Sequence, residues 1–425
     1  MGMIEVTRKM KSDSYKMASL SIETRNNILK NVREALIKNQ QDIFEANKTD
    51  MENAEKNNIA DSVKKRLKFD EHKLSDVTNG IQQLISLPDP INKIVFQREL
   101  DENLILKRIS CPIGVIGIIF EARPDALVQI SSLCIKSGNC AVLKGGKETA
   151  NTNKALFNII YKTAVESGAP EGCMFQAEGH SEIDELLACS KSVDLIIPRG
   201  SNQFVQYIMN NTKIPVMGHA DGICHTYIDG SADADKACKI IIDAKTQYTA
   251  ACNSTETLLI DRNFGTDNLR KVAEALSDSN VKLRGNKEVS DILGCEQMGD
   301  DEYNTEYLDM IISVKLVNGV DEAVAHINNY GSHHTDCIIT ENMDNAEKFL
   351  NLVDSAGVYL NCSTRFADGF RYGFGAEVGI STSKIHARGP VGLEGLTTYK
   401  YKLYGNGHIV DDYSTGRKNF NFKDL

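Results

Sequence analysis

The sequence lacks several features that would assign it to a membrane, to nucleic acid or to a secreted class. Among its 425 residues, no apolar run reaches the roughly 18 residues that a membrane-spanning helix requires. The N-terminal stretch has no secretory apolar core and no clear cleavage site. A net charge of -10 provides no basic surface for nucleic acid or anionic membranes. We therefore expect a cytoplasmic protein, in which a few Arg, Lys and backbone N–H groups can still bind a small anion.

Metal-binding and dinucleotide-binding motifs are also missing. The eleven cysteines form no CxxC pair, which predicts reduced thiols instead of a disulfide framework or a zinc site. The nine histidines show no HExxH spacing, and the adjacent pair His333-His334 is a poor chelate, so we expect no metal. The glycine fingerprint GxGxxG is absent too, so a bound dinucleotide would be contacted in another way.

Hydrophobic patterning predicts an α/β protein. Residues from about 14 to 86 carry apolar side chains at helical spacing, with charges between them. From residue 112 onward short β-rich runs alternate with amphipathic helices, several of which are expected to stop at a glycine, such as Gly138, Gly168 and Gly357. This alternation predicts parallel sheets with helices on their faces, and the number of strands favours two α/β domains over one.

Two further stretches predict antiparallel strands. Residues 97–112 alternate around Asp101-Glu102-Asn103, which indicates a hairpin. Residues 396–405 alternate like an edge strand with no following helix. Together these stretches could join another subunit, although an ordinary edge strand explains the second one more simply.

Three strand-to-helix junctions carry candidate ligand-binding residues. Arg123 stands just before a helix that begins at Pro124, where strand ends of α/β sheets meet ligands, but an ion pair with Glu121 explains it equally well. Lys144 ends a strand before two glycines whose N–H groups suit a phosphate, although an isolated "KGGK" is more often a surface turn. Arg199-Gly200-Ser201 stands before a helix whose N–H groups could face a pyrophosphate.

Two loops contain further charged candidates. The connection "MGHADGICH" holds His219, Asp221 and His225, which could act as a base with its orienting carboxylate, although a structural turn explains them at least as well. The segment 359–379 is dense in glycine, arginine and aromatic residues after a strand. That composition suits a ligand-contacting loop, with Arg365 and Arg371 as candidate anion contacts.

The stretch "QYTAACNSTETLLI" contains the sharpest candidate, Cys252. Its neighbours are Ala251, Asn253, Ser254 and Thr255, which are the residues of a hydrogen-bonded loop directly before an apolar strand. A thiolate is a strong nucleophile near neutral pH, and acyl transfer through a thioester divides a difficult step into two. Most cysteines are simply small buried hydrophobes, so the surrounding loop alone does not decide between the two interpretations.

Ordered motifs along the chain resemble the aldehyde dehydrogenase superfamily. They include "PIGVIGIIFEARPD", "GHADGICH", "DAKTQYTAACNSTETLL" and "HARGPVGLEGLTTYKY", and the resemblance spans essentially residues 10–415. Members of this superfamily bind a nucleotide without the GxGxxG turn, which accounts for its absence here.

The resemblance also implies how the chain is divided into domains. The fold would be aldehyde dehydrogenase-like, with two α/β domains built on parallel sheets and a small β element for oligomerisation. A coenzyme domain is expected at 1–95 and 112–228, a catalytic domain at 229–394, and the oligomerisation element at 96–111 and 395–425.

The same resemblance implies an activity and a set of site residues. The expected reaction is NADPH-dependent reduction of L-glutamate 5-phosphate to L-glutamate 5-semialdehyde, with release of phosphate, in proline biosynthesis. Cys252 matches the nucleophile and Lys144 the lysine at the adenosine ribose and its 2′-phosphate. Gly200 and Ser201 match the turn facing the pyrophosphate, and Glu306 matches the glutamate near the nicotinamide ribose. Arg123, Arg365 and Arg371 remain the candidates for the carboxylate and phosphate of the substrate.

The sequence departs from the hydrolytic members at two places, and the second departure, a missing water-activating acid, favours phosphate over water as the acyl partner. Ala122 stands where those members have the oxyanion-binding Asn, so an oxyanion would rely on backbone N–H groups such as that of Cys252. The stretch "PVMGHADG" has no acid at the position of the water-activating Glu. An acyl-CoA-forming enzyme and a catalytically silent nucleotide-binding protein on the same fold remain alternatives.

The chemistry of the substrate also suggests partners. An acyl phosphate cyclises or hydrolyses readily, so the glutamate 5-kinase that makes it would hand it over directly. Because the chain carries no N-terminal extension of kinase size, that kinase is expected to be a separate protein. We also expect a homo-oligomer.

Overall fold

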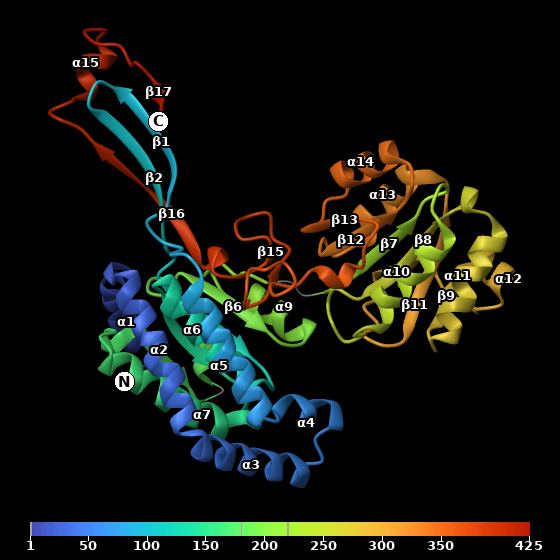
Figure 1. Ribbon diagram of the computed structural model, residues 1–425, viewed down its shortest axis with the longest axis horizontal. Helices are drawn as coiled ribbons and strands as arrows, with labels where there is room; N and C mark the ends of the chain where they lie inside the picture. The colour runs from blue at the N-terminus through green and yellow to red at the C-terminus, as the bar shows by residue number, and fades with distance from the viewer. Residues whose placement is uncertain (1, 180, 219–220) are drawn as a thin grey trace.

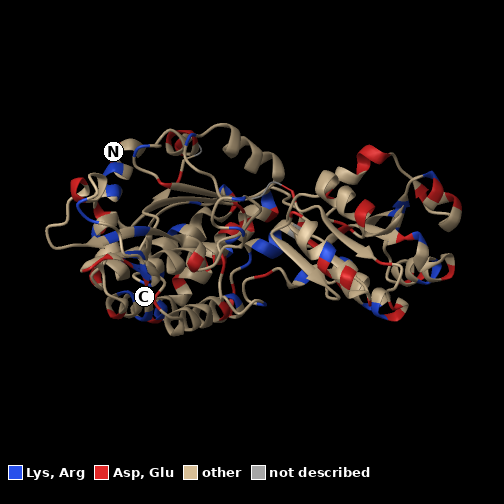
Figure 2. Ribbon diagram, turned by 90° about the horizontal axis from the view of Figure 1, so that it is seen from above, with Lys and Arg blue, Asp and Glu red and all other residues tan. Residues whose placement is uncertain are grey.

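The computed structural model describes residues 2–179, 181–218 and 221–425, and it consists of two lobes and a protruding β arm (Figure 1). Figure 2 shows acidic and basic residues interspersed along both lobes. None of the described helices is both long enough and apolar enough to span a membrane.

The first lobe contains a four-stranded parallel sheet in the order β5-β4-β3-β6. Its strands are β3 (Val115–Phe120), β4 (Cys140–Lys144), β5 (Met174–Ala177) and β6 (Leu195–Arg199). The helices that follow these strands are α6 (Pro124–Ser137), α7 (Ala150–Glu166), α8 (Ser181–Leu187) and α9 (Asn202–Asn210). The N-terminal helices are α1 (Met3–Ser19), α2 (Ile22–Lys38), α3 (Gln40–Lys56), α4 (Asp61–Leu67) and α5 (Glu71–Ser86). One apolar core joins the sheet to these helices apart from α4, whose Leu67 packs in a small separate cluster.

The second lobe contains a seven-stranded parallel sheet in the order β10-β9-β11-β8-β7-β12-β13. Its strands are β7 (Cys224–Ile228), β8 (Thr255–Asp261), β9 (Lys282–Gly285), β10 (Glu296–Gln297), β11 (Ile311–Val317), β12 (Thr335–Ile339) and β13 (Gly357–Leu360). Its helices are α10 (Ala234–Thr246), α11 (Thr266–Asp278), α12 (Lys287–Leu293), α13 (Gly319–Tyr330) and α14 (Met343–Leu352). These two lobes agree with the α/β architecture expected from the alternating pattern.

The lobes differ from the predicted domain limits at two places. β7, which the limit after residue 228 assigns to the coenzyme domain, pairs with β8 and β12 of the second sheet. Its fully buried side chains need neighbours on both faces, which the second lobe provides. Several apolar residues between 376 and 393, predicted to belong to the catalytic domain, pack instead into the core of the first lobe. The segment containing β14 (Ile380–Ser381) and β15 (Gly389–Pro390) therefore runs back from the second lobe to the first.

Two of the three glycines that were predicted to end helices lie at helix ends. Gly138 ends α6 in the left-handed region with φ 73°, as predicted. Gly168, with φ 106°, follows the last turn of α7. The prediction for Gly357 is wrong, because α14 already ends at Leu352 and Gly357 opens β13.

The arm is an antiparallel sheet in the order β16-β2-β1-β17. β1 (Ile94–Asp101) and β2 (Leu104–Pro112) form the predicted hairpin, and Asn103 takes a φ of 61° in its turn. β16 (Thr397–Tyr404) adds to the β2 edge, while α15 (Val410–Ser414) and β17 (Lys423–Asp424) complete the tip. The arm projects away from both lobes (Figure 1), and all of β16 after Thr397 is exposed.

Candidate active site

A cavity of about 930 Å³ is lined by residues of both lobes. The first lobe contributes the ends of β3 and β6 and the start of α9, and the second lobe contributes the loops around Cys252, Glu306 and Arg365. Of the residues predicted to form a site, the cavity brings together Cys252, Gly200, Ser201, Glu306, Arg123 and Arg365. Lys144 and Arg371 do not line it.

Cys252 lies in the loop between α10 and β8, and its side chain is half-buried. Hydrogen bonds hold this loop from behind: Thr364 Oγ1 donates to the Asn253 carbonyl at 2.7 Å, and Asn253 Nδ2 donates to the Ala367 carbonyl at 2.8 Å. The Cys224 thiol donates to the Cys252 carbonyl at 3.3 Å. The small polar residues around Cys252 thus tie its backbone to neighbouring segments and leave the sulfur at the cavity wall.

The backbone of Gly222 lies directly against the nucleophile loop. A Cβ atom at position 222 would stand 2.1 Å from the Cys252 carbonyl oxygen and 2.5 Å from its Cα. The Gly222 N–H donates to Glu306 Oε1 at 2.9 Å, and the other oxygen of that carboxylate accepts from Asn202 Nδ2 at 2.9 Å. Glu306 therefore links the Gly222–Cys252 contact to the first residue of α9.

Gly200 and Ser201 form the turn between β6 and α9. A Cβ at position 200 would stand 2.7 Å from Glu121 Oε2 and 3.0 Å from Phe204, so only glycine fits without displacing them. Ser201 is the N-cap residue of α9, and its side chain makes no capping hydrogen bond. The turn therefore directs the N-terminal end of a nine-residue helix toward the cavity, where an anionic group would be stabilised.

The arginine candidates have different surroundings. Arg123 forms an ion pair with Asp125 at 2.9 Å, not with Glu121, and Lys73 lies 3.6 Å from the same carboxylate. Arg365 donates from Nε to Gln247 Oε1 at 3.0 Å. Arg371 is exposed outside the cavity and donates to the Arg365 carbonyl at 2.7 Å, so it contacts the backbone of Arg365 and not the cavity.

Lys144 lies at the carboxyl end of β4, as expected, and is only 7% exposed. Its Nζ donates to the Gly145 carbonyl at 2.7 Å. Burial lowers its pKa, an effect that Glu182 and Glu148 oppose. Its role at a nucleotide ribose stays a prediction, since it lies beyond the cavity lining.

Among the described residues of the histidine-containing connection, Asp221 and His225 do not pair with each other. His225 is fully buried on β7, where its N–H and Nδ1 contact Asp336 Oδ1 at 2.7 and 3.2 Å. Asp221 accepts a hydrogen bond from Asn202 at 2.6 Å. His219 lies outside the described residues. The described part of the chain contains no group of three or more potential ligands arranged for a metal ion.

The surroundings of Ala122 bear on the expected oxyanion contacts, which stay a prediction. The Ala122 N–H already donates to Glu148 Oε1 at 2.7 Å, and the residue packs with Ala54 and Leu67. Position 122 therefore supplies no side-chain donor for an oxyanion, and its N–H has another acceptor.

Arg199 and Glu377 line the cavity and were missed as site residues. Arg199 stood next to the Gly200-Ser201 turn, and only the turn was singled out. Glu377 is contained in the glycine-rich segment "GFGAEVG". Burial raises the pKa of Glu377 to about 7, which the Gly369 N–H and Arg199 oppose. Two features of the sequence could have indicated these residues: Arg199 is an arginine at the end of a strand, and Glu377 is an acidic residue in a glycine-rich loop.

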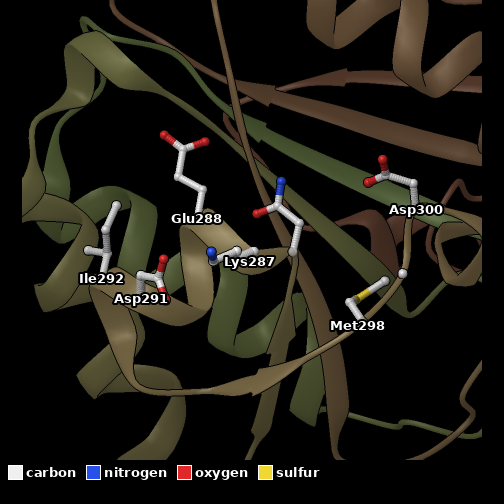
Figure 3. A pocket seen from close by; sticks show the side chains of 8 residues that line it. Lys287, Glu288, Asp291, Ile292, Met298 and Asp300 are labelled. Carbon is white, nitrogen blue, oxygen red and sulfur yellow. The ribbon is translucent and has the colours of Figure 1, made fainter.

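A second pocket lies at the start of α12 in the second lobe (Figure 3). Its lining carries charges of both signs, on Lys287, Glu288, Asp291 and Asp300, and it includes none of the predicted site residues. The pocket contains no thiol and none of the predicted site residues, so the cavity at Cys252 is the candidate active site.

Comparison with known proteins defines the family. Residues 3–291 match the model of the aldehyde dehydrogenase family. The chain belongs to this family, and the expected resemblance and fold are confirmed.

Relatives that match over their full length indicate which members of the family this chain resembles. The chain is 55% identical over 407 residues to a gamma-glutamyl phosphate reductase of Ruminiclostridium cellulolyticum, with 96% of this chain and 94% of the relative covered. It is 53% identical to the enzyme of the same name from Brachyspira hyodysenteriae, with 100% and 99% covered. The crystal structure of gamma-glutamyl phosphate reductase from Thermotoga maritima matches with a TM-score of 0.93 at 36% identity, covering 95% of this chain and 99% of that one.

The contact between Gly222 and Cys252 leads to a first prediction. Gly222→Ala should lower kcat/KM by about 10²-fold, because the added methyl group must push the nucleophile loop away from its position. Initial rates and thermal unfolding of the purified variant would measure this.

Gly80→Ala is the control for this experiment. Gly80 lies in α5 outside the cavity, and its added Cβ would meet nothing within 4 Å, so the rate of this variant should stay near that of the unmodified chain. A Gly222→Ala enzyme with an unchanged rate would contradict the inferred contact.

Proposed function

We propose that this chain catalyses the NADPH-dependent reduction of L-glutamate 5-phosphate to L-glutamate 5-semialdehyde, with release of phosphate, in proline biosynthesis. Its similarity over the full length to proteins named gamma-glutamyl phosphate reductase supports this reaction. The observation that carries the proposal is the position of Cys252, in a tied loop at the wall of a cavity lined by both lobes.

The nucleophilic step belongs to Cys252. Its thiolate attacks the acyl carbon of the substrate, the bond from that carbon to the phosphate oxygen breaks, and phosphate leaves with the electron pair. The product is a thioester on Cys252. NADPH, when bound, supplies the hydride that reduces this thioester. The resulting tetrahedral alkoxide collapses to the aldehyde and returns the thiolate to Cys252, with backbone N–H groups of the loop positioned to stabilise the oxyanion.

The residues of the cavity fit a nicotinamide nucleotide. The turn at Gly200 leaves a space that a side chain would fill, and the N-terminal end of α9 suits a pyrophosphate. Glu306 is held at the same wall by two hydrogen bonds and would accept from a ribose hydroxyl. Lys144 is the proposed contact for the adenosine ribose and its 2′-phosphate. A member of the fold from Methanocaldococcus jannaschii was solved in complex with NADP, at 16% identity and a TM-score of 0.66.

Arg123 and Arg365 are the proposed contacts for the anionic groups of the substrate. Both line the cavity, and both present a guanidinium, which binds carboxylate and phosphate oxygens in a bidentate manner. Arg371 is proposed to help position Arg365, because it donates a hydrogen bond to the Arg365 carbonyl and does not line the cavity.

A separate glutamate 5-kinase is the proposed source of the substrate, because an acyl phosphate is short-lived in water. Mixing the two purified proteins should protect the intermediate from hydroxylamine trapping. Full trapping, together with no association of the two proteins, would rule the partnership out.

The arm is proposed to join copies of this chain. On β16, Tyr399, Tyr401 and Leu403 alternate with Lys400 and Lys402, and the three apolar side chains are each more than half exposed. An exposed apolar face on an edge strand is usually covered by a partner.

The reverse reaction tests the proposed activity. Glutamate 5-semialdehyde with NADP⁺ should give steady-state NADPH formation that depends on added phosphate, because phosphate must release the thioester from Cys252. Cys252→Ser should reduce this rate by at least about 10³-fold, since a serine hydroxyl is a far weaker nucleophile at neutral pH. The absorbance of NADPH measures both.

Other outcomes of this assay would select another function. Turnover indifferent to phosphate would indicate a hydrolytic aldehyde dehydrogenase. Turnover that requires coenzyme A would indicate an acyl-CoA-forming enzyme. Binding of NADPH without any turnover would indicate a silent nucleotide-binding protein.

A second experiment tests the arm. The double variant Tyr401→Glu/Leu403→Glu places two carboxylates on the apolar face of β16 and should convert the oligomer to monomers in light scattering after gel filtration. Lys402→Glu, on the opposite face of the same strand, should leave the oligomer intact. An unmodified chain that already runs as a monomer would refute the role of the arm.

A further inference from the structure

Arg199 occupies a distinctive place in the cavity. It is the last residue of β6, paired with Phe120 of β3, at the strand end that opens beside Cys252. Burial lowers the pKa of its guanidinium and so does the neighbouring charge of Arg123, whereas Glu377, Cys252 and Asp125 act in the opposite direction. The guanidinium thus lies within electrostatic range of the nucleophile.

Arg199 differs in its partners from Arg123 and Arg365, the two arginines of the cavity proposed to contact the substrate. Arg123 is neutralised by Asp125, and Arg365 donates to Gln247. Within residues 2–179, 181–218 and 221–425, no carboxylate lies within ion-pair distance of the Arg199 guanidinium, and no hydrogen bond of its side chain is formed. Holding a cation without an ion-pair partner away from bulk water, beside a second cation, costs free energy, and the charge of Glu377 offsets this cost only in part. An incoming anion would remove that cost.

We propose that Arg199 binds the phosphoryl group of the acyl phosphate and stabilises the phosphate as it leaves. This inference rests on the proposed function, and it names a contact for one particular group of the substrate. The phosphate is attached to the carbon that Cys252 attacks, so it must lie beside the sulfur. The substrate's α-carboxylate is separated from that carbon by the rest of the glutamyl chain.

The chemistry of the step suits a guanidinium at this position. When the carbon–oxygen bond breaks, its electron pair goes to the phosphate oxygen, and the negative charge on the leaving group increases. Two parallel N–H groups of Arg199 would donate hydrogen bonds to the leaving phosphate. These hydrogen bonds become stronger as its negative charge increases, so they stabilise the transition state more than the bound substrate. In the reverse direction the same donors would hold inorganic phosphate for attack on the thioester.

Another anion competes for this assignment. The Gly200-Ser201 turn follows Arg199 directly, so a phosphate of the nucleotide could bind the guanidinium instead. The experiment therefore has to separate the phosphate that reacts from the phosphates of NADP.

The reverse reaction distinguishes the reacting phosphate from the phosphates of NADP, because it proceeds in two steps and only the second requires inorganic phosphate. Oxidation of the aldehyde by NADP⁺ forms the thioester and one NADPH per active site, without phosphate. Release of the thioester then requires phosphate. Arg199→Gln should keep the rapid burst of NADPH and the KM for NADP⁺, while the KM for inorganic phosphate rises at least about tenfold and the phosphate-dependent rate falls about 10²–10³-fold.

Two further variants complete the test. Arg199→Lys retains the charge but loses the bidentate geometry, and it should recover part of the phosphate-dependent rate. Arg262→Gln is the matched control, since Arg262 is ion-paired with Glu288 on the surface of the second lobe and should leave both steps unchanged. If Arg199→Gln fails to fold, as judged by its thermal unfolding, Arg199→Lys is compared with the unmodified chain by the same readouts.

Distinct results would overturn the proposal. A higher KM for NADP⁺ with an unchanged KM for phosphate would assign Arg199 to the nucleotide. An unchanged KM for phosphate with an intact burst and rate would show that Arg199 binds neither. If the unmodified chain forms NADPH without any dependence on phosphate, the proposed function itself fails, and the phosphate site fails with it.

Discussion

The contact between Gly222 and the Cys252 loop is the constraint on which the candidate site depends. It brings two backbone segments closer than any side chain at position 222 would allow. The carboxylate of Glu306 then receives the Gly222 N–H on one oxygen and Asn202 on the other. Because Asn202 begins α9 of the first lobe, this short chain of contacts connects Cys252 of the second lobe to the Gly200-Ser201 turn of the first.

The two lobes present opposite ends of their sheets to the same cavity. In the first lobe Arg123, Arg199 and the Gly200-Ser201 turn follow strands, at the carboxyl ends where ligands of α/β sheets usually bind. In the second lobe Cys252 precedes β8, and Glu306 precedes β11. The nucleophile is therefore held by a loop at the amino end of its sheet, which explains why side-chain hydrogen bonds from Thr364 and Asn253 are needed to fix it.

This arrangement also explains which parts of the site could be predicted from sequence. The carboxyl-end rule drew attention to Arg123 and the Gly200-Ser201 turn, which line the cavity, since a strand followed by a helix start is a local signal. No local rule selects a cysteine in front of a strand, and Cys252 was identified mainly through family resemblance. Arg199 was not assigned as a site residue, because what distinguishes it is the lack of a nearby ion-pair partner. That property can be read only from the folded structure.

The fold shows the same division between local and tertiary signals. Alternating strands and helices were predictable from periodicity, and Gly138 ended its helix as expected. The assignment of β7 to the second sheet depends on pairing with β8 and β12, which no residue pattern within β7 reveals. Gly357 looked like the end of a helix because a glycine followed an amphipathic run, but the helix had already ended five residues earlier, at Leu352.

Charge placement, more than net charge, explains how such a protein can receive an anionic substrate. The chain carries a net charge of -10, which opposes an acyl phosphate at long range. Beyond about 10 Å this field is screened at ordinary ionic strength, so the groups inside the cavity decide. Six basic and five acidic side chains line it, and Asp125 is already occupied by Arg123 and Lys73. Arg199 and Arg365 line the same cavity as Cys252, so positive charge is available at the wall where the proposed reaction generates negative charge.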